Sequence, residues 1–319
     1  MKITVIGCGR WGSFIAYYLD SIGHDVTLYG LEKSPEMQRF LKERRNDLIE
    51  LSDTTKLSVD KNDIKGAETV VISIGSQGLR SLMAELGELG LENKKIVLCM
   101  KGIEVSSGKR LSEIVTENTS ETNRVAVWLG PGHVQEFYRG VPNCMVIDSS
   151  DEELKIELVE SFSSDLIRFY YGEDLIGSEI GGAAKNVLGI AAGMLDGLSM
   201  TSLKGALMSR GTREIARLMG AMGGKESSAY GLCLLGDYEA TLFSKHSHNR
   251  AFGEMFVRGE HFEALAEGYY TVRALMVLKD RYNVDLPICT AVNEILYNGA
   301  DPKRELLGLF ERKLKHEME

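Results

Sequence analysis

The sequence is poor in cysteine, and its cysteines form no recognisable pattern. Five occur among 319 residues, an odd number, and they lie far apart in mostly apolar surroundings. They are Cys8, Cys99, Cys144, Cys233 and Cys289. Such spacing argues against a disulfide framework, a zinc site and a Cys-x-x-Cys redox motif. We therefore expect reduced thiols in the core, no bound metal and a cytoplasmic protein.

Positive charge is also scarce. The chain has 37 basic against 46 acidic side chains and a formal net charge of -9. The overall attraction that draws proteins to nucleic acids or anionic membranes is therefore absent. We expect neither as a partner, and an anionic ligand must be held by a local group of cationic side chains.

Long hydrophobic runs are missing as well. The most apolar stretch of the second half, residues 180–195, contains Lys185 and Asn186. It is shorter than the roughly 20 residues that a membrane span needs, so it predicts a buried helix instead. The chain begins directly with the strand-like segment Lys2–Ile6, which leaves no room for a secretory leader, and we expect no secretion.

Up to about residue 172, strand-like segments alternate with helix-like ones, as in a parallel sheet covered by crossover helices. The predicted strands are Lys2–Ile6, Asp25–Tyr29, Thr69–Ile74, Lys95–Met100, Arg124–Leu129, Asn143–Ile147 and Leu166–Tyr171. Beyond this point the strand signals stop, and residues 206–219 and 263–279 show helical periodicity. The sequence predicts an α/β fold, with a Rossmann-type doubly wound parallel sheet over residues 1–174 and an all-α C-terminal domain over residues 175–319.

A glycine-rich turn follows the first predicted strand. Residues 7–12 read Gly-Cys-Gly-Arg-Trp-Gly and lead into an amphipathic segment. In this setting Gly7 allows a tight turn, Gly9 lets backbone amides approach a pyrophosphate, and Gly12 allows close packing of helix on strand. The pattern predicts a dinucleotide site, and a glycine-rich turn without a ligand is the less favoured interpretation.

The end of the second predicted strand bears on the choice of cofactor. An acidic residue in this region commonly binds the adenosine ribose, and a basic one accommodates a 2′-phosphate. Glu32 stands slightly late for the first role, and Lys33 is within reach of the second. The sequence therefore favours NAD(H) slightly over NADP(H), while two solvated loop charges are an equally good interpretation.

Two lysines stand at positions suited to chemistry. Lys101 follows a buried strand, at the carboxyl edge where open α/β sheets bind ligands. Lys185 lies among the small and apolar side chains of residues 179–193, where burial lowers the pKa of an ammonium and makes it a better proton donor and acceptor near neutrality. We predict Lys185 as the general acid/base; the alternative is a lysine that extends its charge to solvent.

A polar segment follows later in the second half. Residues 235–241 and 244–250 place a carboxylate, hydroxyls, an amide and a guanidinium in close succession. Asp237 is suited to set the charge state of the buried lysine, and the other groups suit a small phosphorylated substrate. His246 and His248 are two residues apart without a further ligand motif, so they do not indicate a metal site. By itself this segment is also typical of a polar loop.

Together and in order, these segments resemble the NAD(P)-dependent glycerol-3-phosphate dehydrogenases over nearly the whole chain. The shared motifs are the first glycine motif, Lys-Gly at 101–102, Gly-Pro at 130–131, Gly-Gly-Ala-x-Lys-Asn at 181–186, Gly-Asp-x-x-x-Thr at 236–241 and Asn-Arg at 249–250. Each motif is modest evidence, but the ordered set is specific. The resemblance implies reversible reduction of dihydroxyacetone phosphate to sn-glycerol 3-phosphate with NAD(P)H, a step that feeds phospholipid synthesis.

The resemblance also implies roles for individual residues. Lys185 resembles the proton donor, and Lys101 and Asp237 resemble its catalytic partners. The residues expected to contact substrate are Lys101, Gly130, Gly132, Lys185, Asp237, Thr241, Ser247, His248 and Asn249. Those expected at the cofactor are Gly7, Gly9, Arg10, Trp11, Gly12, Glu32, Lys101, Val134, His248 and Glu267.

Three features depart from the family pattern. His248 stands where the family usually has an arginine that binds the phosphate, and histidine offers fewer donors and is mostly neutral at pH 7. Arg250 and Lys204 are candidates to compensate. Gly132 stands where the family has a small hydroxyl residue, and the charged stretch 38–49 replaces an Asn-rich segment, which leaves the choice between NAD and NADP open.

Two other functions remain in view. A dehydrogenase of 3-hydroxy acids keeps the fold and cofactor but changes the substrate; the histidine at 248 favours it, whereas Asp237, Thr241 and Asn249 argue against it. A non-catalytic sensor of the NADH/NAD ratio needs the glycine loop but not a buried lysine beside a carboxylate. The resemblance and the helical second domain favour a homodimer.

Overall fold

The computed structural model describes residues 1–314 and 316–317, and the chain divides into two compact units. The sheet unit comprises Met1–Met100 and Leu111–Leu175, and the helical unit comprises Lys101–Arg110 and the chain from Ile176 onward. This division differs from the predicted one at Lys101–Arg110, which the sequence pattern assigns to the first domain. The segment belongs to the helical unit because its Ile103 is fully buried in the hydrophobic core of the helices.

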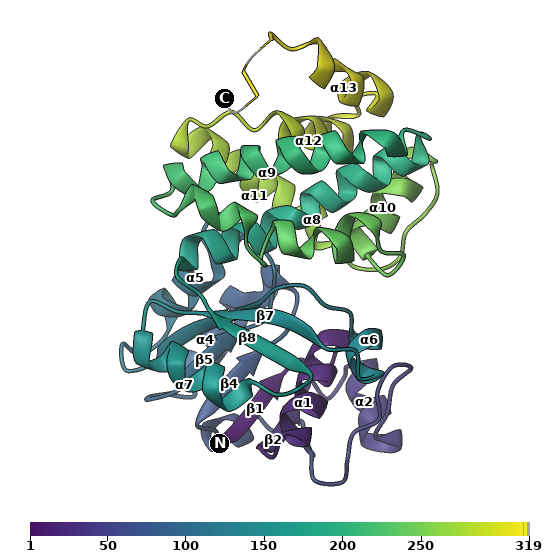
Figure 1. Cartoon of the computed structure of the whole chain (residues 1–319). Coiled ribbons are helices and arrows are strands. Elements are labelled where there is room, and N and C mark those ends of the chain that lie inside the picture. Colours follow the sequence, from purple (N-terminus) through teal and green to yellow (C-terminus); the bar gives the residue numbers. More distant parts are fainter. Residues whose placement is uncertain (315, 318–319) are drawn as a thin grey trace. The chain divides into compact units, whose positions relative to one another are not determined.

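The sheet unit is built on one eight-stranded sheet (Figure 1). In chain order the strands are β1 (Lys2–Ile6), β2 (Asp25–Tyr29), β3 (Lys56–Ser58), β4 (Thr69–Ile72), β5 (Lys95–Leu98), β6 (Arg124–Leu129), β7 (Asn143–Asp148) and β8 (Ile167–Tyr171). Across the sheet they follow the order β3-β2-β1-β4-β5-β6-β7-β8. The strand order reverses beside β1, which is the place where doubly wound sheets bind nucleotides.

All predicted strands are present, with ends that differ by at most two residues, but the sheet contains two features that the sequence did not reveal. Strand β3 has only three residues, too few for a recognisable alternation of apolar and polar side chains. Strands β6 and β7 are antiparallel, whereas the prediction was a wholly parallel sheet. The helix between them, α6 (Val134–Tyr138), has five residues and is too short to return the chain to the opposite end of the sheet.

Helices cover both faces of the sheet. They are α1 (Arg10–Ser21), α2 (Pro35–Glu43), α3 (Asn62–Lys65), α4 (Leu79–Glu88), α5 (Leu111–Asn118), α6 and α7 (Glu152–Phe162). Successive strand residues point to opposite faces, and Val70, Val71 and Ile72 of β4 are all 0% exposed. In another part of the sheet, Trp128 of β6 is fully buried and packs edge-on against Phe169 of β8, with ring centroids 4.9 Å apart.

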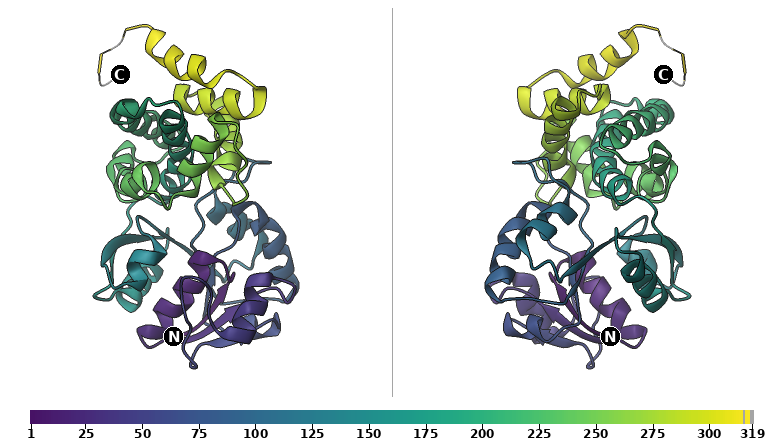
Figure 2. Two further views of the ribbon diagram at one scale, coloured as in Figure 1. Left: turned by 90° about the vertical axis from the view of Figure 1, so that its right-hand side faces the viewer. Right: turned by 90° about the vertical axis from the view of Figure 1, so that its left-hand side faces the viewer.

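The helical unit contains the predicted all-α half of the chain. Its helices are α8 (Leu175–Gly197), α9 (Lys204–Ala221), α10 (His248–Val257), α11 (Glu267–Tyr282), α12 (Pro287–Asn298) and α13 (Pro302–Gly308), with a π-helix at Glu239–Phe243. Helix α13, yellow in Figure 2, follows α12 and buries Leu306 in the core of this unit. In the part of the chain that the structure describes, none of the helices has the length and hydropathy required to span a bilayer.

Helix α8 is the buried helix predicted over residues 180–195, and every residue of that stretch is buried. Its glycines let neighbouring backbones approach closely, because a Cβ at Gly193 would lie 1.9 Å from the carbonyl oxygen of Arg250 in α10. Helix α11 begins at Glu267, later than the helical pattern at 263 predicts. The side-chain oxygen of Asn249 accepts the backbone N–H of Gly268 at 2.9 Å and so caps the first turn of α11 from outside the helix.

Candidate active site

A cluster of buried charges lies at the middle of α8 in the helical unit. Lys185 is 6% exposed, and its Nζ lies 2.6 Å from Oδ2 of Asp237 and donates to Oγ1 of Thr241 at 2.7 Å. Asp237 and Thr241 are themselves only 1% and 2% exposed. The predicted burial of Lys185 is confirmed, and the alternative in which its charge extends to solvent is wrong.

The second lysine of the cluster, Lys101, is the first residue of the segment Lys101–Arg110, which follows β5 and belongs to the helical unit. Lys101 Nζ donates to the same Oδ2 of Asp237 at 2.7 Å, and its side chain is 21% exposed. The carbonyl of Lys101 accepts a hydrogen bond from Nδ2 of Asn186 at 3.2 Å, which fixes the start of the segment on α8. The structure thus brings together the three residues predicted as catalytic, with one carboxylate between two ammonium groups.

This arrangement tunes the proton affinity of Lys185. Burial, the largest effect, lowers the pKa of Lys185 to about 7, while Asp237 acts in the opposite direction and Lys101 adds to the lowering. A lysine with a pKa near neutrality exchanges protons readily with a reacting oxygen. The cluster is therefore equipped for general acid/base chemistry at neutral pH.

The polar segment reaches the lysine through a π-helix, Glu239–Phe243. π-helices are rare in proteins, and those that do occur are frequently found at functional sites. This turn places Thr241 toward Lys185 while the preceding Tyr238 points into the core, where its hydroxyl lies 3.0 Å from Oγ1 of Thr212. No feature of the sequence predicts this turn, because π-helices have no distinctive spacing of apolar residues.

A chain of amide hydrogen bonds extends the cluster along α8. Asn186, adjacent to Lys185, accepts at its side-chain oxygen from Nδ2 of Asn249 at 3.0 Å, and Asn249 in turn caps the first turn of α11 at Gly268. Asn186 was not among the predicted site residues. The signal that marks it is an amide beside a lysine in an otherwise apolar helix.

The other predicted residues of the helical unit serve partly in local structure. Ser247 is the N-cap of α10, where its hydroxyl accepts from the backbone N–H of Arg250 at 3.3 Å. His248 Nδ1 lies 3.3 Å from the carbonyl oxygen of Leu265, and Glu267 is the first residue of α11. Among the described residues there is no group of three His, Cys, Asp or Glu side chains that could hold a metal ion.

The glycine motif forms the turn between β1 and α1 in the sheet unit. Gly7 has φ +110°, and a Cβ there would lie 2.2 Å from the carbonyl oxygen of Ser73. A Cβ at Gly12 would lie 2.0 Å from the carbonyl oxygen of Gly7, whereas a Cβ at Gly9 would meet no atom within 4 Å. Two of the glycines are thus required by packing, and the third leaves open space at the N-terminus of α1. No side chain caps this terminus, so the turn fits a pyrophosphate held by backbone amides and the helix dipole.

Trp11 and Val134 pack within the sheet unit. The Trp11 ring lies 5.3 Å from that of Phe14, beside Arg10 at the start of α1, and the Val134 side chain is 3% exposed in the core. Val134 can therefore offer a ligand only its backbone. Glu32 lies exposed in the turn after β2, where its carbonyl accepts from Gln38 Nε2 at 2.6 Å.

The glycines of the Gly-Pro-Gly turn after β6 have backbone conformations that residues with a side chain rarely adopt. Gly130 has φ +126° and Gly132 has φ +155°. A Cβ at Gly132 would lie 2.2 Å from the ring of Phe137 in α6. With the Phe137 ring in this position, the turn has no room for a side chain at position 132.

Comparison with known proteins finds one enzyme family that matches both units of the chain. Family models described as NAD-dependent glycerol-3-phosphate dehydrogenase N-terminus and C-terminus match residues 2–155 and 174–306. The chain is 35% identical to glycerol-3-phosphate dehydrogenase (NAD(P)+) of Fusobacterium nucleatum subsp. nucleatum, with 96% of each chain covered. It is 34% identical to the protein of the same name from Chlorobium phaeobacteroides, with 100% of this chain and 99% of the relative covered.

A solved structure is similar over the same extent. The crystal structure of glycerol-3-phosphate dehydrogenase from Coxiella burnetii superposes with a TM-score of 0.90 at 27% identity. The match covers 97% of this chain and 98% of that one. The similarity therefore extends over both units.

Proposed function

Since the chain belongs to the NAD-dependent glycerol-3-phosphate dehydrogenase family, we propose that it reversibly reduces dihydroxyacetone phosphate to sn-glycerol 3-phosphate with NAD(P)H. The observation that supports this most directly is the buried group of Lys185, Asp237 and Lys101. A nicotinamide-dependent reduction of a ketone needs one proton donor and a positive field at the carbonyl oxygen, and this group supplies both.

In the proposed reaction each member of the cluster has a separate task. The bound dinucleotide supplies the hydride to the ketone carbon. Lys185 donates its proton to the oxygen as negative charge develops there, and Lys101 stabilises that charge. Asp237 holds both ammonium groups in place, and the Thr241 hydroxyl, which accepts from Lys185 at 2.7 Å, orients the proton donor.

The cofactor is assigned to the sheet unit. We expect the pyrophosphate over Gly9 at the N-terminus of α1, where a side chain is absent and the first amides of the helix point outward. Glu32, exposed in the turn after β2, is suited to the ribose hydroxyls of NAD(H). On this basis NAD(H) is slightly preferred over NADP(H). Glu267 and His248 are proposed to approach the cofactor from the helical unit.

The substrate is assigned to the polar groups around the cluster. We propose that Ser247, His248 and Asn249 at the start of α10, with the backbone at Gly130 and Gly132, contact the phosphate and hydroxyl groups. A helix N-terminus favours an anion, which offsets in part the missing arginine at position 248. We further propose a homodimer that acts in the cytoplasm and supplies glycerol 3-phosphate for phospholipid synthesis.

The test is absorbance at the nicotinamide band while the purified protein is mixed with dihydroxyacetone phosphate and either NADH or NADPH. A 3-keto acid serves as the control substrate. We expect oxidation with dihydroxyacetone phosphate and a faster rate with NADH. Turnover of the 3-keto acid alone would instead support a hydroxyacid dehydrogenase, which the histidine at 248 favours. Tight NADH binding without turnover of either substrate would contradict both enzymatic functions.

A further inference from the structure

A second group of paired charges, largely shielded from solvent, lies in the helical unit. Asp196, near the end of α8, accepts hydrogen bonds from Lys204 Nζ at 2.6 Å and from Arg250 NH1 at 2.9 Å. The side chains of Lys204 and Arg250 are 6% and 14% exposed. Buried charges of this kind are costly unless they are paired and fully hydrogen-bonded. Here α8, α9 and α10 each contribute one of the paired groups.

Both cations also bind the backbone that follows Thr241. Lys204 Nζ donates to the carbonyl of Leu242 at 3.0 Å, and Arg250 Nε donates to the carbonyl of Ser244 at 3.1 Å. The first carbonyl belongs to the π-helix and the second to the residue directly after it. The backbone that carries the Thr241 hydroxyl is therefore held at two points by two cations that share the Asp196 carboxylate.

We propose that Asp196, Lys204 and Arg250 form a positioning network that holds Thr241, and through it the ammonium of Lys185, in the geometry for proton transfer. The proposal rests on the proposed function, because it assigns these residues an effect on the proposed proton donor. None of the three contacts Lys185, so each acts through the π-helix and not as a catalytic residue.

The pairing of charges argues for positioning and against a phosphate site. Arg250 NH1 also donates to Oε2 of Glu254 at 2.7 Å, so two carboxylates accompany the two cations. Although burial opposes ionisation, hydrogen bonds from Lys204 and Arg250 hold the pKa of Asp196 below its ordinary value. The group therefore has little net positive charge to attract an anion. The role of compensating for the absent phosphate-binding arginine does not suit either cation.

The network has a consequence for the pH dependence of the reaction. The Thr241 oxygen accepts from the Lys185 ammonium and so favours its charged form, as Asp237 also does, while Lys101 opposes it. Because a hydrogen bond to the charged form favours that form, we expect loss of the Thr241 contact to lower the pKa of Lys185 further. The alkaline limb of ketone reduction, where the proton donor loses its proton, then moves to lower pH.

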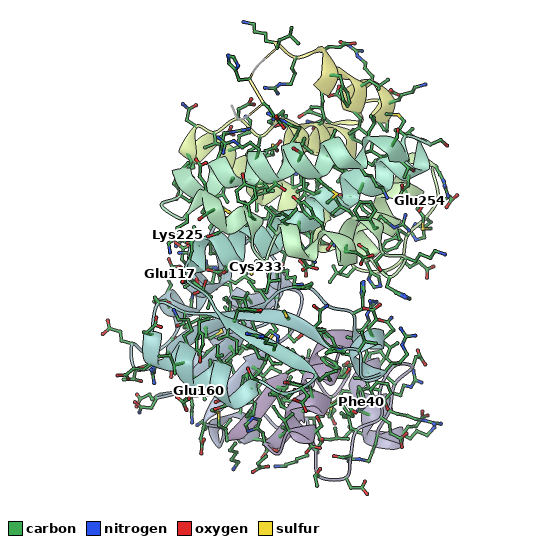
Figure 3. All side chains as sticks on the ribbon, viewed as in Figure 1. Phe40, Glu117, Glu160, Lys225, Cys233 and Glu254 are labelled. Atoms are coloured by element: carbon green, nitrogen blue, oxygen red, sulfur yellow. The ribbon has the colours of Figure 1, made fainter. Side chains whose placement is uncertain are left out.

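The experiment compares two arginines on one helix. Glu254, labelled in Figure 3, pairs with Arg250 and also with Arg258 NH2 at 2.7 Å. Arg250→Gln and Arg258→Gln remove the same charge beside the same carboxylate, but only the first releases Asp196 and the Ser244 carbonyl. We expect Arg250→Gln to lower kcat by about tenfold or more, as small displacements of reacting groups do. Its alkaline limb should move to lower pH with KM for dihydroxyacetone phosphate nearly unchanged, and Arg258→Gln should match the unmodified protein.

Two kinetic outcomes would overturn the proposal. One is equal kinetics and equal pH profiles for both variants. The other is a raised KM for dihydroxyacetone phosphate with kcat and the pH profile unchanged, which identifies Arg250 as a substrate contact. If Arg250→Gln does not fold, Lys204→Gln releases the Leu242 carbonyl at the other point of attachment, and the same signature is expected.

A readout that needs no turnover separates this proposal from the proposed function. Hydrogen–deuterium exchange of a peptide covering residues 239–247 reports how firmly the backbone is held. Faster exchange in Arg250→Gln than in Arg258→Gln supports the network even if the unmodified protein fails to reduce dihydroxyacetone phosphate. Equal exchange in the two variants overturns the network whatever the substrate.

Discussion

At the scale of single residues, Lys185 is the side chain whose removal is most informative. Lys185→Met keeps most of the unbranched apolar side chain and removes the amine. We expect kcat to fall by about a hundredfold or more, the typical contribution of a general acid, with the affinity for NADH unchanged. The matched control is Lys155→Met, because Lys155 is also 6% exposed and pairs with one carboxylate, that of Glu152. Turnover retained in Lys185→Met would remove its assigned role.

The pH dependence of the two reaction directions follows from the same residue. Reduction needs the Lys185 ammonium and oxidation needs the neutral amine, and its pKa is lowered by burial to about 7. We therefore expect kcat for reduction to fall, and kcat for oxidation of glycerol 3-phosphate to rise, as the pH increases through about 7. Initial rates in both directions at constant ionic strength check this. Two profiles with the same slope would contradict it.

Protonation of the Glu214 carboxyl in α9 should make the free energy of unfolding depend on pH. This residue is 1% exposed and accepts the backbone N–H groups of Ile288 and Cys289, each at 2.9 Å, at the start of α12. Burial, although opposed by these hydrogen bonds, raises the pKa of Glu214 from 4.5 to about 7. Below 4.5 both folded and unfolded chains hold the proton, so the stability from this group is fully present there and declines as the pH rises through about 7. The change is on the order of 3 kcal/mol.

Glu214→Gln should remove this slope. We expect the free energy of unfolding, measured in urea at a series of pH values, to depend less on pH between about 5 and 7 in the variant. Glu263→Gln, which changes an exposed carboxyl of the helical unit, is the control and should keep the original dependence. Parallel curves for Glu214→Gln and the unmodified protein would show that Glu214 titrates normally.

At the scale of elements, different glycines of the turn between β1 and α1 are expected to serve packing and cofactor binding. In Gly12→Ala the new Cβ would lie 2.0 Å from the carbonyl oxygen of Gly7, so we expect a loss of stability of about 1–3 kcal/mol or more. In Gly9→Ala the Cβ meets no protein atom, so the thermal midpoint should stay nearly unchanged. NADH binding should nevertheless weaken by about tenfold, because the methyl group occupies the approach to the helix N-terminus. Calorimetric titration of both variants checks this, and undiminished NADH affinity in Gly9→Ala would place the pyrophosphate elsewhere.

Elements with strong local patterns were predictable from the sequence, and those set by long-range contacts were not. The buried strands and α8 follow directly from runs of apolar residues. Strand β3 is too short to show a pattern of its own and is held by its pairing with β2, and the reversal of β7 follows from the short connection after β6, so the spacing of apolar residues predicts neither. In the candidate site, Lys185 stands out as a charge in an apolar helix. The hydrogen bond from Asn186 to the Lys101 carbonyl joins residues 85 apart, and no local spacing announces it.

At the scale of the whole molecule, the chain crosses between the units more than once, and neighbouring buried residues stabilise different units. Ile96 of β5 and Ile103 are both 0% exposed, yet Ile96 belongs to the sheet unit and Ile103 to the core of the helical unit. We expect alanine at either position to cost about 2–5 kcal/mol. Hydrogen exchange should increase in the strands for Ile96→Ala and in the helices around Lys185 for Ile103→Ala. The same exchange pattern in both variants would contradict this division.

The placement of the aromatic residues makes the two units optically distinguishable. The chain has two tryptophans, Trp11 in α1 and Trp128 in β6, and both lie in the sheet unit. Intrinsic tryptophan emission therefore follows the sheet unit alone, whereas far-ultraviolet circular dichroism also follows α8 to α13. In one denaturant titration, separate midpoints for the two signals would mean that the units melt independently, and coincident midpoints would mean a single cooperative transition.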